Sequence, residues 1–265
     1  NMYWLGLLGV FTVILLQVYI ALKLRDRFRD IDRRFEKNDS GFLKISSTID
    51  TAIDDVNDKY LDIQNTVALS SIDFNYPVSF GGWSIDGFLA KRITQILLES
   101  PPKLILEIGS GSSTILIEKC TRQLGYTPEH IAIDHEKRYL KLTERLALAN
   151  SPDNTIEFHQ CNLGEIQAHD GPWYLGLPEI IGSRKIDLLI IDGPPETTHP
   201  RARYPALPIL HDHLSQNCIV ILDDASRDDE KAIIKKWLSM YPSFELEIIH
   251  EGHGVAILTR CENPS

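Results

Sequence analysis

The chain has 265 residues, of which 43% are hydrophobic and 24% are charged, so it is apolar enough to fold and is not a disordered tail. Its formal net charge of −10 and its pI of about 5.4 argue against a protein that holds nucleic acid through a basic surface, and no nucleic-acid partner is expected. Four widely spaced cysteines fit neither a zinc site nor a disulfide framework and indicate a reducing compartment.

The first charged side chain is that of Lys23, and residues 2–22 are mostly apolar. A helix of this length spans roughly 30 Å, the thickness of the hydrocarbon core of a bilayer, so residues 1–22 are predicted to form a transmembrane anchor. Six basic residues follow within residues 23–34, which predicts that the rest of the chain lies on the cytoplasmic side. A signal peptide is the alternative, but the segment lacks a basic start and a small-residue cleavage site.

Apolar residues then recur at alternating steps of four and three from Leu24 to Ile63. This repeat predicts a coiled-coil stalk over residues 23–69, with an interruption at residues 38–41. Membrane anchors would hold such helices parallel, so we expect a homo-oligomer. The alternative is an amphipathic helix that packs on the chain's own globular domain.

Residues 70–265 are predicted to form one α/β domain, in which helices cover both faces of a mostly parallel sheet. The expected strands lie at residues 103–108, 130–134, 155–160, 186–191, 218–222, 244–250 and 254–259. The expected helices lie at residues 84–99, 113–124, 136–149, 204–215 and 227–239, with Ser84 and Ser226 as candidate capping residues.

The last two strands are separated by three residues, 251–253, too few for a helical crossover. They are therefore expected to pair as an antiparallel hairpin. A dinucleotide-binding dehydrogenase would instead continue with parallel units, so this class is disfavoured.

The first strand of the sheet leads into a glycine-rich turn, Gly109-Ser110-Gly111. Glycines let a ligand approach the backbone closely and let the chain turn into a helix whose first N–H groups point at that ligand. The second strand ends at Asp134, 25 residues after Gly109, where a carboxylate can accept hydrogen bonds from a ribose diol. Together these features predict a nucleoside pocket.

Five motifs resemble, in order, those of the class I S-adenosylmethionine (SAM)-dependent methyltransferases, and specifically the branch described as methyltransferase family 24: E-I-G-S-G-S-S, A-I-D, I-I-D-G-P-P, R-Y-P-A-L-P and I-L-D-D-A-S-R-D-D-E. The resemblance covers roughly residues 75–260 and implies a Rossmann-like seven-stranded sheet with an antiparallel last strand. One departure is Ser113, where many relatives have a third glycine.

The resemblance also implies a set of SAM-binding residues. Asp134 would hold the ribose hydroxyls, Asn162 would contact the adenine edge, and Asp192 would border the cofactor. The methionine and ribose end would be lined by Glu107, Gly109, Ser110 and Gly111. The alternatives are a solvated strand end for Glu107 and an ordinary turn residue for Asn162.

Three acids are expected at the edge of the sheet beside the cofactor, because Asp192 ends the fourth strand and Asp223 and Asp224 end the fifth. Carboxylates gathered there would repel one another unless a hard divalent cation lay between them, and oxygen ligands suit Mg²⁺. This arrangement resembles the metal-dependent O-methyltransferases, including those that act on sugars, which implies Mg²⁺-assisted transfer. The alternative is that Asp223 and Asp224 cap the following helix and pair with Arg227.

Among nine histidines, His199 is the first choice for a general base, because it lies in the proline-rich loop after Asp192, the second candidate catalytic residue. The alternative is a loop histidine without a catalytic role. Arg201, Arg203 and Tyr204 follow in the same loop and could bind an anionic or hydroxylated acceptor, or belong to a solvated loop without a role. Trp173 and Tyr174 could form an aromatic wall for the acceptor or belong to the core.

The sequence thus predicts a membrane-anchored, cytoplasm-facing enzyme that transfers a methyl group from SAM to a hydroxyl of a small-molecule, glycan or lipid-linked acceptor. The alternative is an oligomeric membrane scaffold whose methyltransferase-like domain binds a nucleoside ligand or a partner protein without turnover.

Overall fold

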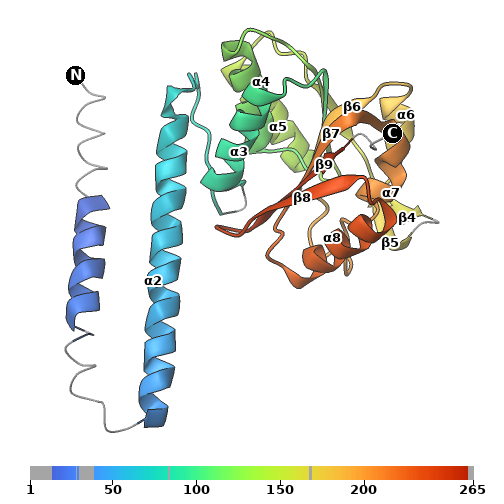
Figure 1. Cartoon of the computed structure of the whole chain (residues 1–265). Helices are drawn as coiled ribbons and strands as arrows, with labels where there is room; N and C mark the ends of the chain where they lie inside the picture. The colour runs from blue at the N-terminus through green and yellow to red at the C-terminus, as the bar shows by residue number, and fades with distance from the viewer. Residues whose placement is uncertain (1–13, 28, 30–38, 83, 167–168, 262–265) are drawn as a thin grey trace. The chain divides into compact units, whose positions relative to one another are not determined.

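The computed structural model describes residues 14–27, 29, 39–82, 84–166 and 169–261 (Figure 1). The chain divides into two compact units, residues 1–64 and residues 65–265.

The first unit is helical where it is described, with a helical segment at residues 14–27 and helix α2 (Asp39–Ala68), which continues into the second unit. The described residues contain no helix that is both long enough and apolar enough to cross a bilayer. Residues 1–13 of the predicted anchor lie outside the described residues, so the anchor stays a prediction.

Helix α2 begins inside the predicted interruption at residues 38–41 and carries the second part of the predicted heptad repeat. Three apolar residues of that repeat are exposed in the single chain: Ile45 (57%), Val56 (43%) and Ile63 (37%). The coiled coil itself stays a prediction.

The second unit is built on a seven-stranded sheet in the order β3-β2-β1-β6-β7-β9-β8. Only β9 runs antiparallel, and it pairs with β7 on one side and β8 on the other. The strands are β1 (Leu104–Ile108), β2 (Glu129–Asp134), β3 (Glu157–Gln160), β6 (Ile186–Ile191), β7 (Leu214–Asp223), β8 (Phe244–Ile249) and β9 (Val255–Arg260). The predicted Rossmann-like sheet with an antiparallel last strand is therefore confirmed.

Helices cover both faces of this sheet and bury its apolar side chains in two clusters. One cluster joins the sheet to α3 (Gly87–Glu99) and α4 (Ser112–Gln123), against which α5 (Lys137–Asn150) packs. The other cluster joins the sheet to α6 (Leu177–Ile181), α7 (Ala206–Leu210) and α8 (Asp228–Met240). Single 3-10 turns follow α2 at Leu69–Ser71 and α7 at His211–His213. Burial on both faces explains why these strands read as continuous apolar runs.

Two parts of the fold differ from the sequence-based expectation. Strands β4 (Leu163–Ile166) and β5 (His169–Tyr174) form an additional antiparallel hairpin, with a register shift, outside the main sheet. The helix expected at residues 204–215 ends at Leu210, because β7 begins earlier than predicted and pairs from Leu214 onward.

The predicted capping residues were wrong as well. Asp86, not Ser84, caps α3, because its Oδ1 accepts a hydrogen bond from the backbone N–H of Leu89 (2.9 Å). Its Oδ2 accepts another from the N–H of His253 (3.0 Å), in the turn between β8 and β9. The N-cap of α8 is the residue after Ser226, Arg227. Asp86 therefore ties the start of α3 to the turn that precedes the last strand.

Candidate active site

The turn between β1 and α4 is packed on one side and open on the other. Gly109 has a φ of +99°, a conformation that favours glycine, and a Cβ on it would lie 3.2 Å from the carbonyl carbon of Asp192. At Gly111, the N-cap of α4, no described residue other than its two chain neighbours has an atom within 4 Å of the position that a Cβ would take. The turn thus offers the start of α4 to a ligand, as a nucleoside pocket requires.

Asp134, the last residue of β2, faces this turn. Its Oδ2 accepts a hydrogen bond from the Ser110 hydroxyl (3.3 Å), and its Oδ1 accepts one from the N–H of Glu136 (2.8 Å). The Nδ1 atom of His135 lies 3.4 Å from the same Oδ1. These contacts fix the carboxylate beside the glycine turn, where it can accept hydrogen bonds from a diol.

Glu107 lies inside the protein rather than at a solvated strand end, since none of its surface is exposed. Its Oε2 lies 2.7 Å from Nε2 of the buried His130. Its Oε1 is buried and has no hydrogen-bond partner among the described residues. The alternative of a solvated strand end is therefore wrong, while contact of Glu107 with SAM stays a prediction.

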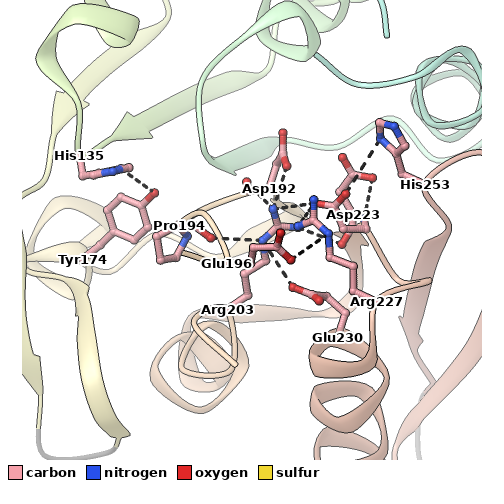
Figure 2. Close-up of polar contacts among 11 residues, drawn as sticks. His135, Tyr174, Asp192, Pro194, Glu196, Arg203, Asp223, Arg227, Glu230 and His253 are labelled. Atoms are coloured by element: carbon pink, nitrogen blue, oxygen red, sulfur yellow. Dashed lines mark hydrogen bonds and ion pairs between the residues drawn. The ribbon is translucent and has the colours of Figure 1, made fainter. Parts of the chain in front are cut away.

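The predicted acids converge at the carboxyl ends of β6 and β7, and a guanidinium lies among them (Figure 2). The Nη2 atom of Arg203 lies 3.2 Å from Oδ1 of Asp192 and 2.8 Å from Oδ2 of Asp224. Its Nη1 donates to the main-chain carbonyl of Asp223 (2.9 Å). The Nη1 atom of Arg227 lies 2.7 Å from the same Asp224 oxygen. Two arginines therefore reduce the repulsion among these acids.

Burial nevertheless has a large effect on protonation in this cluster. It raises the pKa of Asp192 to about 6, with Arg203 opposing the rise and the Asp224 carboxylate adding to it. Burial and the neighbouring Asp192 and Asp224 charges raise the pKa of Asp223 well above its usual range. The Asp192 side chain is 31% exposed and the Asp224 side chain 10%, so Asp192 is the more accessible of the two.

The predicted magnesium triad does not fit this arrangement. Among the described residues, possible metal-ligand atoms lie within 4.8 Å of one another in Asp223, Asp224 and His253. Asp192 does not belong to this group. Arg203 bridges Asp192 and Asp224, where a cation shared by the three acids would have to lie. The ion pair of Asp224 with Arg227, which was the alternative to a metal, is present.

The structure places two further predicted residues at the β4–β5 hairpin. The His199 ring packs on Gly171 of β5, and its Nδ1 lies 2.9 Å from the carbonyl oxygen of Pro200. Asn162 is exposed and directly precedes β4. Its carbonyl oxygen accepts a hydrogen bond from the N–H of Leu175, which directly follows β5 (3.0 Å). Their predicted roles as base and adenine contact stay predictions.

The structure also places the loop arginine and the two aromatic residues. Arg203 was expected to meet an acceptor but is only 3% exposed, whereas Trp173 and Tyr174 belong to the core, which was the alternative to an aromatic wall. The Tyr174 hydroxyl lies 3.5 Å from Nδ1 of His135, and the two rings pack edge to face (Figure 2). His135 directly follows Asp134 at the end of β2, and this place was the signal that could have marked it as a neighbour of that carboxylate.

The sheet order, the antiparallel β9, the open glycine turn and the acid at the end of β2 define the fold of the class I methyltransferases. Comparison with known proteins agrees with this class: residues 106–225 match the family described as a methyltransferase domain. No curated protein matches the chain.

Several solved structures share the fold. They include a putative caffeoyl-CoA O-methyltransferase from Staphylococcus aureus, which is 16% identical over 77% of this chain and 99% of that chain, with a TM-score of 0.55. A methyltransferase from Podospora anserina bound to SAH is 14% identical over 68% of this chain and 81% of that chain (TM-score 0.53). An O-methyltransferase from Bacillus cereus in complex with SAH is 12% identical over 80% and 97% (TM-score 0.51). Residues 106–225 therefore resemble a methyltransferase domain, and the second unit shares the fold of these solved methyltransferases.

Proposed function

We propose that this protein transfers a methyl group from SAM to a hydroxyl of a small-molecule, glycan or lipid-linked acceptor. The observation that carries the proposal is the open turn at Gly109–Gly111, with Asp134 on one side and Asp192 on the other. When bound, SAM supplies a methyl group activated by a positively charged sulfur. The acceptor oxygen bonds to the methyl carbon as the carbon–sulfur bond breaks, and the acceptor's proton passes to a base.

In this proposal the chain holds the two reactants and takes up the proton. Asp134 and the N–H groups at the start of α4 bind the nucleoside part. Asp192 is the base: Arg203 holds its Oδ1, whereas its Oδ2 makes no hydrogen bond within the described part of the chain. Holding reactants and base in one geometry supplies much of the rate. His199, packed on the hairpin, is the second candidate for the base.

Calorimetric titration with S-adenosylhomocysteine tests the nucleoside site. Wild type is expected to bind, and Asp134→Ala is expected to weaken binding about tenfold or more, because hydrogen bonds to a charged group contribute about 1.5–3 kcal/mol. Asp212→Ala is the matched control, since this acid is 98% exposed and precedes β7, at the opposite edge of the sheet. Failure of wild type to bind, or unaltered binding by Asp134→Ala, would contradict the site.

Turnover is tested with methyl-labelled SAM and pools of glycans and membrane lipids as acceptors. Label in an acid-stable, hydroxyl-derived ether is the expected product. Tight binding of S-adenosylhomocysteine without transfer to any pool would favour the scaffold function instead.

We also propose that residues 1–22 anchor the protein in a membrane, with the methyltransferase domain on the cytoplasmic side, and that the stalk joins copies of the chain. The uncharged run before Lys23 and the basic cluster after it support the anchor. The exposed apolar residues of α2 support the association of copies. Alkaline extraction of membranes tests the anchor: full-length protein is expected to stay with the membrane fraction, and release would contradict it.

A further inference from the structure

Arg203 is a charged side chain that is almost entirely enclosed, with 3% of its surface exposed. Its guanidinium contacts both strand ends of the acidic cluster. Besides the three contacts described above, Nη2 donates to the main-chain carbonyl of Asp192 (2.9 Å), and Nε lies 3.4 Å from the carbonyl oxygen of Pro194 and 4.0 Å from Oε1 of the buried Glu230. One side chain thus binds the backbone at the ends of β6 and β7 as well as the acids there (Figure 2).

The positive charge of Arg203 disfavours a second cation between Asp192 and Asp224. A buried carboxylate is costly unless it is paired, and Arg203 pairs with both of these acids. A divalent cation placed between them would lie against the guanidinium, and like charges a few ångströms apart repel strongly in a poorly solvated site. Arg203 and a bridging cation are therefore alternatives.

We propose that Arg203 takes the place of a divalent cation in this protein: it neutralises the acids at the ends of β6 and β7 and fixes Asp192, so that transfer needs no metal. Arg203 contacts Asp192 and is shielded from the acceptor, so it is a positioning residue. The inference rests on the proposed function, because it assigns Asp192 its orientation for that reaction.

The geometry requires arginine and not merely a positive charge. A planar guanidinium donates in several fixed directions, which lets Arg203 bind two main-chain carbonyls and two carboxylates at once. Lysine carries the same charge on a single ammonium group and could not make all of these contacts from one position.

The first experiment measures metal binding and metal dependence in the full-length protein. Wild type is expected to keep its full transfer rate in excess EDTA, and MgCl₂ should neither raise its melting temperature nor give heat in calorimetry. Arg203→Met leaves the acids without their partner and is expected to gain a melting-temperature increase on addition of MgCl₂. Loss of wild-type activity in EDTA together with recovery on addition of Mg²⁺ would overturn the inference.

The second experiment separates positioning from charge, and it also serves if Arg203→Met fails to fold. Arg203→Lys is expected to bind S-adenosylhomocysteine within about threefold of wild type but to lose about tenfold or more in kcat. Addition of Mg²⁺ should not restore that loss. Wild-type kcat in Arg203→Lys would show that charge alone suffices and would overturn the positioning role.

These outcomes are distinguishable from failure of the proposed function. If the wild-type protein binds no S-adenosylhomocysteine, the proposed function is contradicted. If it binds S-adenosylhomocysteine but transfers methyl groups only with Mg²⁺, only the role of Arg203 is contradicted. The melting-temperature comparison of wild type with Arg203→Met does not depend on knowing the acceptor.

Discussion

Asp192 and Asp223 lie at neighbouring strand ends and share Arg203, yet they suit different tasks. Asp192 keeps 31% of its side chain exposed, whereas Asp223 is 4% exposed and its Oδ1 accepts the N–H of Asp224. An accessible carboxylate with one oxygen fixed by a guanidinium can meet a substrate proton. A buried carboxylate that binds its own backbone supports the strand end.

The pH dependence of transfer is expected to follow Asp192. Because burial raises the pKa of this carboxyl in the ligand-free protein to about 6, the proposed base is charged above that pH and protonated below it, so kcat/KM should fall as the pH drops through about 6. Asp192→Asn removes the base and is expected to lower kcat by about a hundredfold or more. Rate profiles between about pH 5 and 8 measure both effects, with Asp212→Asn as the control that should follow wild type. A wild-type profile in Asp192→Asn would exclude this residue as the base.

The same carboxyl should lower stability at neutral pH. Its pKa in the folded protein lies above the ordinary value of about 3.9, so the stability that it contributes is fully present below that value and is lost as the pH rises through about 6. In urea denaturation at pH 7.5, the free energy of unfolding of Asp192→Asn is therefore expected to exceed that of wild type by about 1–2 kcal/mol. Near pH 4 the two proteins should be equally stable. Lower stability of the variant at pH 7.5 would contradict the raised pKa of Asp192, because that pKa already includes the attraction to Arg203.

The convergence of the three acids could be predicted, because parallel neighbouring strands end at one edge of a sheet. The place of Arg203 could not be predicted, since spacing does not show whether a loop side chain turns inward or toward solvent. The place of His253 could have been predicted from the antiparallel hairpin. Asp223 pairs with Val255, so the residues just before Val255 must lie near the end of β7.

At the scale of elements, the strands of the main sheet could be predicted because burial on both faces gives each a run of apolar residues. The β4–β5 hairpin was missed, because its runs are short and are interrupted by Gly164, Gly171 and Pro172. The first part of β7 was missed because residues 215–217 are polar and interrupt its apolar run. They lie where the pairing of β7 with β6 shifts register, between Ile186 and Leu188 of β6.

Asp86 connects two elements far apart in the sequence, so its loss should be felt by both. Asp86→Ala removes the cap of α3 and leaves the N–H of His253 unpaired, which is expected to cost about 1–3 kcal/mol in the free energy of unfolding. Ser84→Ala is the matched control and should stay within about 0.5 kcal/mol of wild type. Urea denaturation measures both. A larger loss in Ser84→Ala than in Asp86→Ala would contradict the assignment of the cap.

At the scale of the whole molecule, the described structure accounts for the fold of residues 65–265. The predicted association of copies depends instead on α2. Val56 and Ile63 belong to the heptad repeat and are exposed, and Leu61, also exposed, lies between them on another side of the helix. Apolar side chains exposed in a regular line on one helix are typical of a surface that another helix covers.

Substitution on α2 tests this in the full chain. Val56→Asp combined with Ile63→Asp is expected to convert an oligomer into a monomer in detergent solution, because buried unpaired charges oppose helix association. Leu61→Asp should keep the oligomer. Sedimentation measures the mass of each, and a wild-type monomer, or a double variant that stays oligomeric, would contradict association through this line of residues.

Strand β9 comes last in the sheet along the chain but lies between β7 and β8. During synthesis on the ribosome, β7 therefore waits with an unpaired outer edge, and β8 has no strand to join until residues 255–260 emerge. An open strand edge invites pairing with other chains. Translation that stops before Val255 would thus leave an aggregation-prone fragment for the cell's proteases rather than a weakened enzyme.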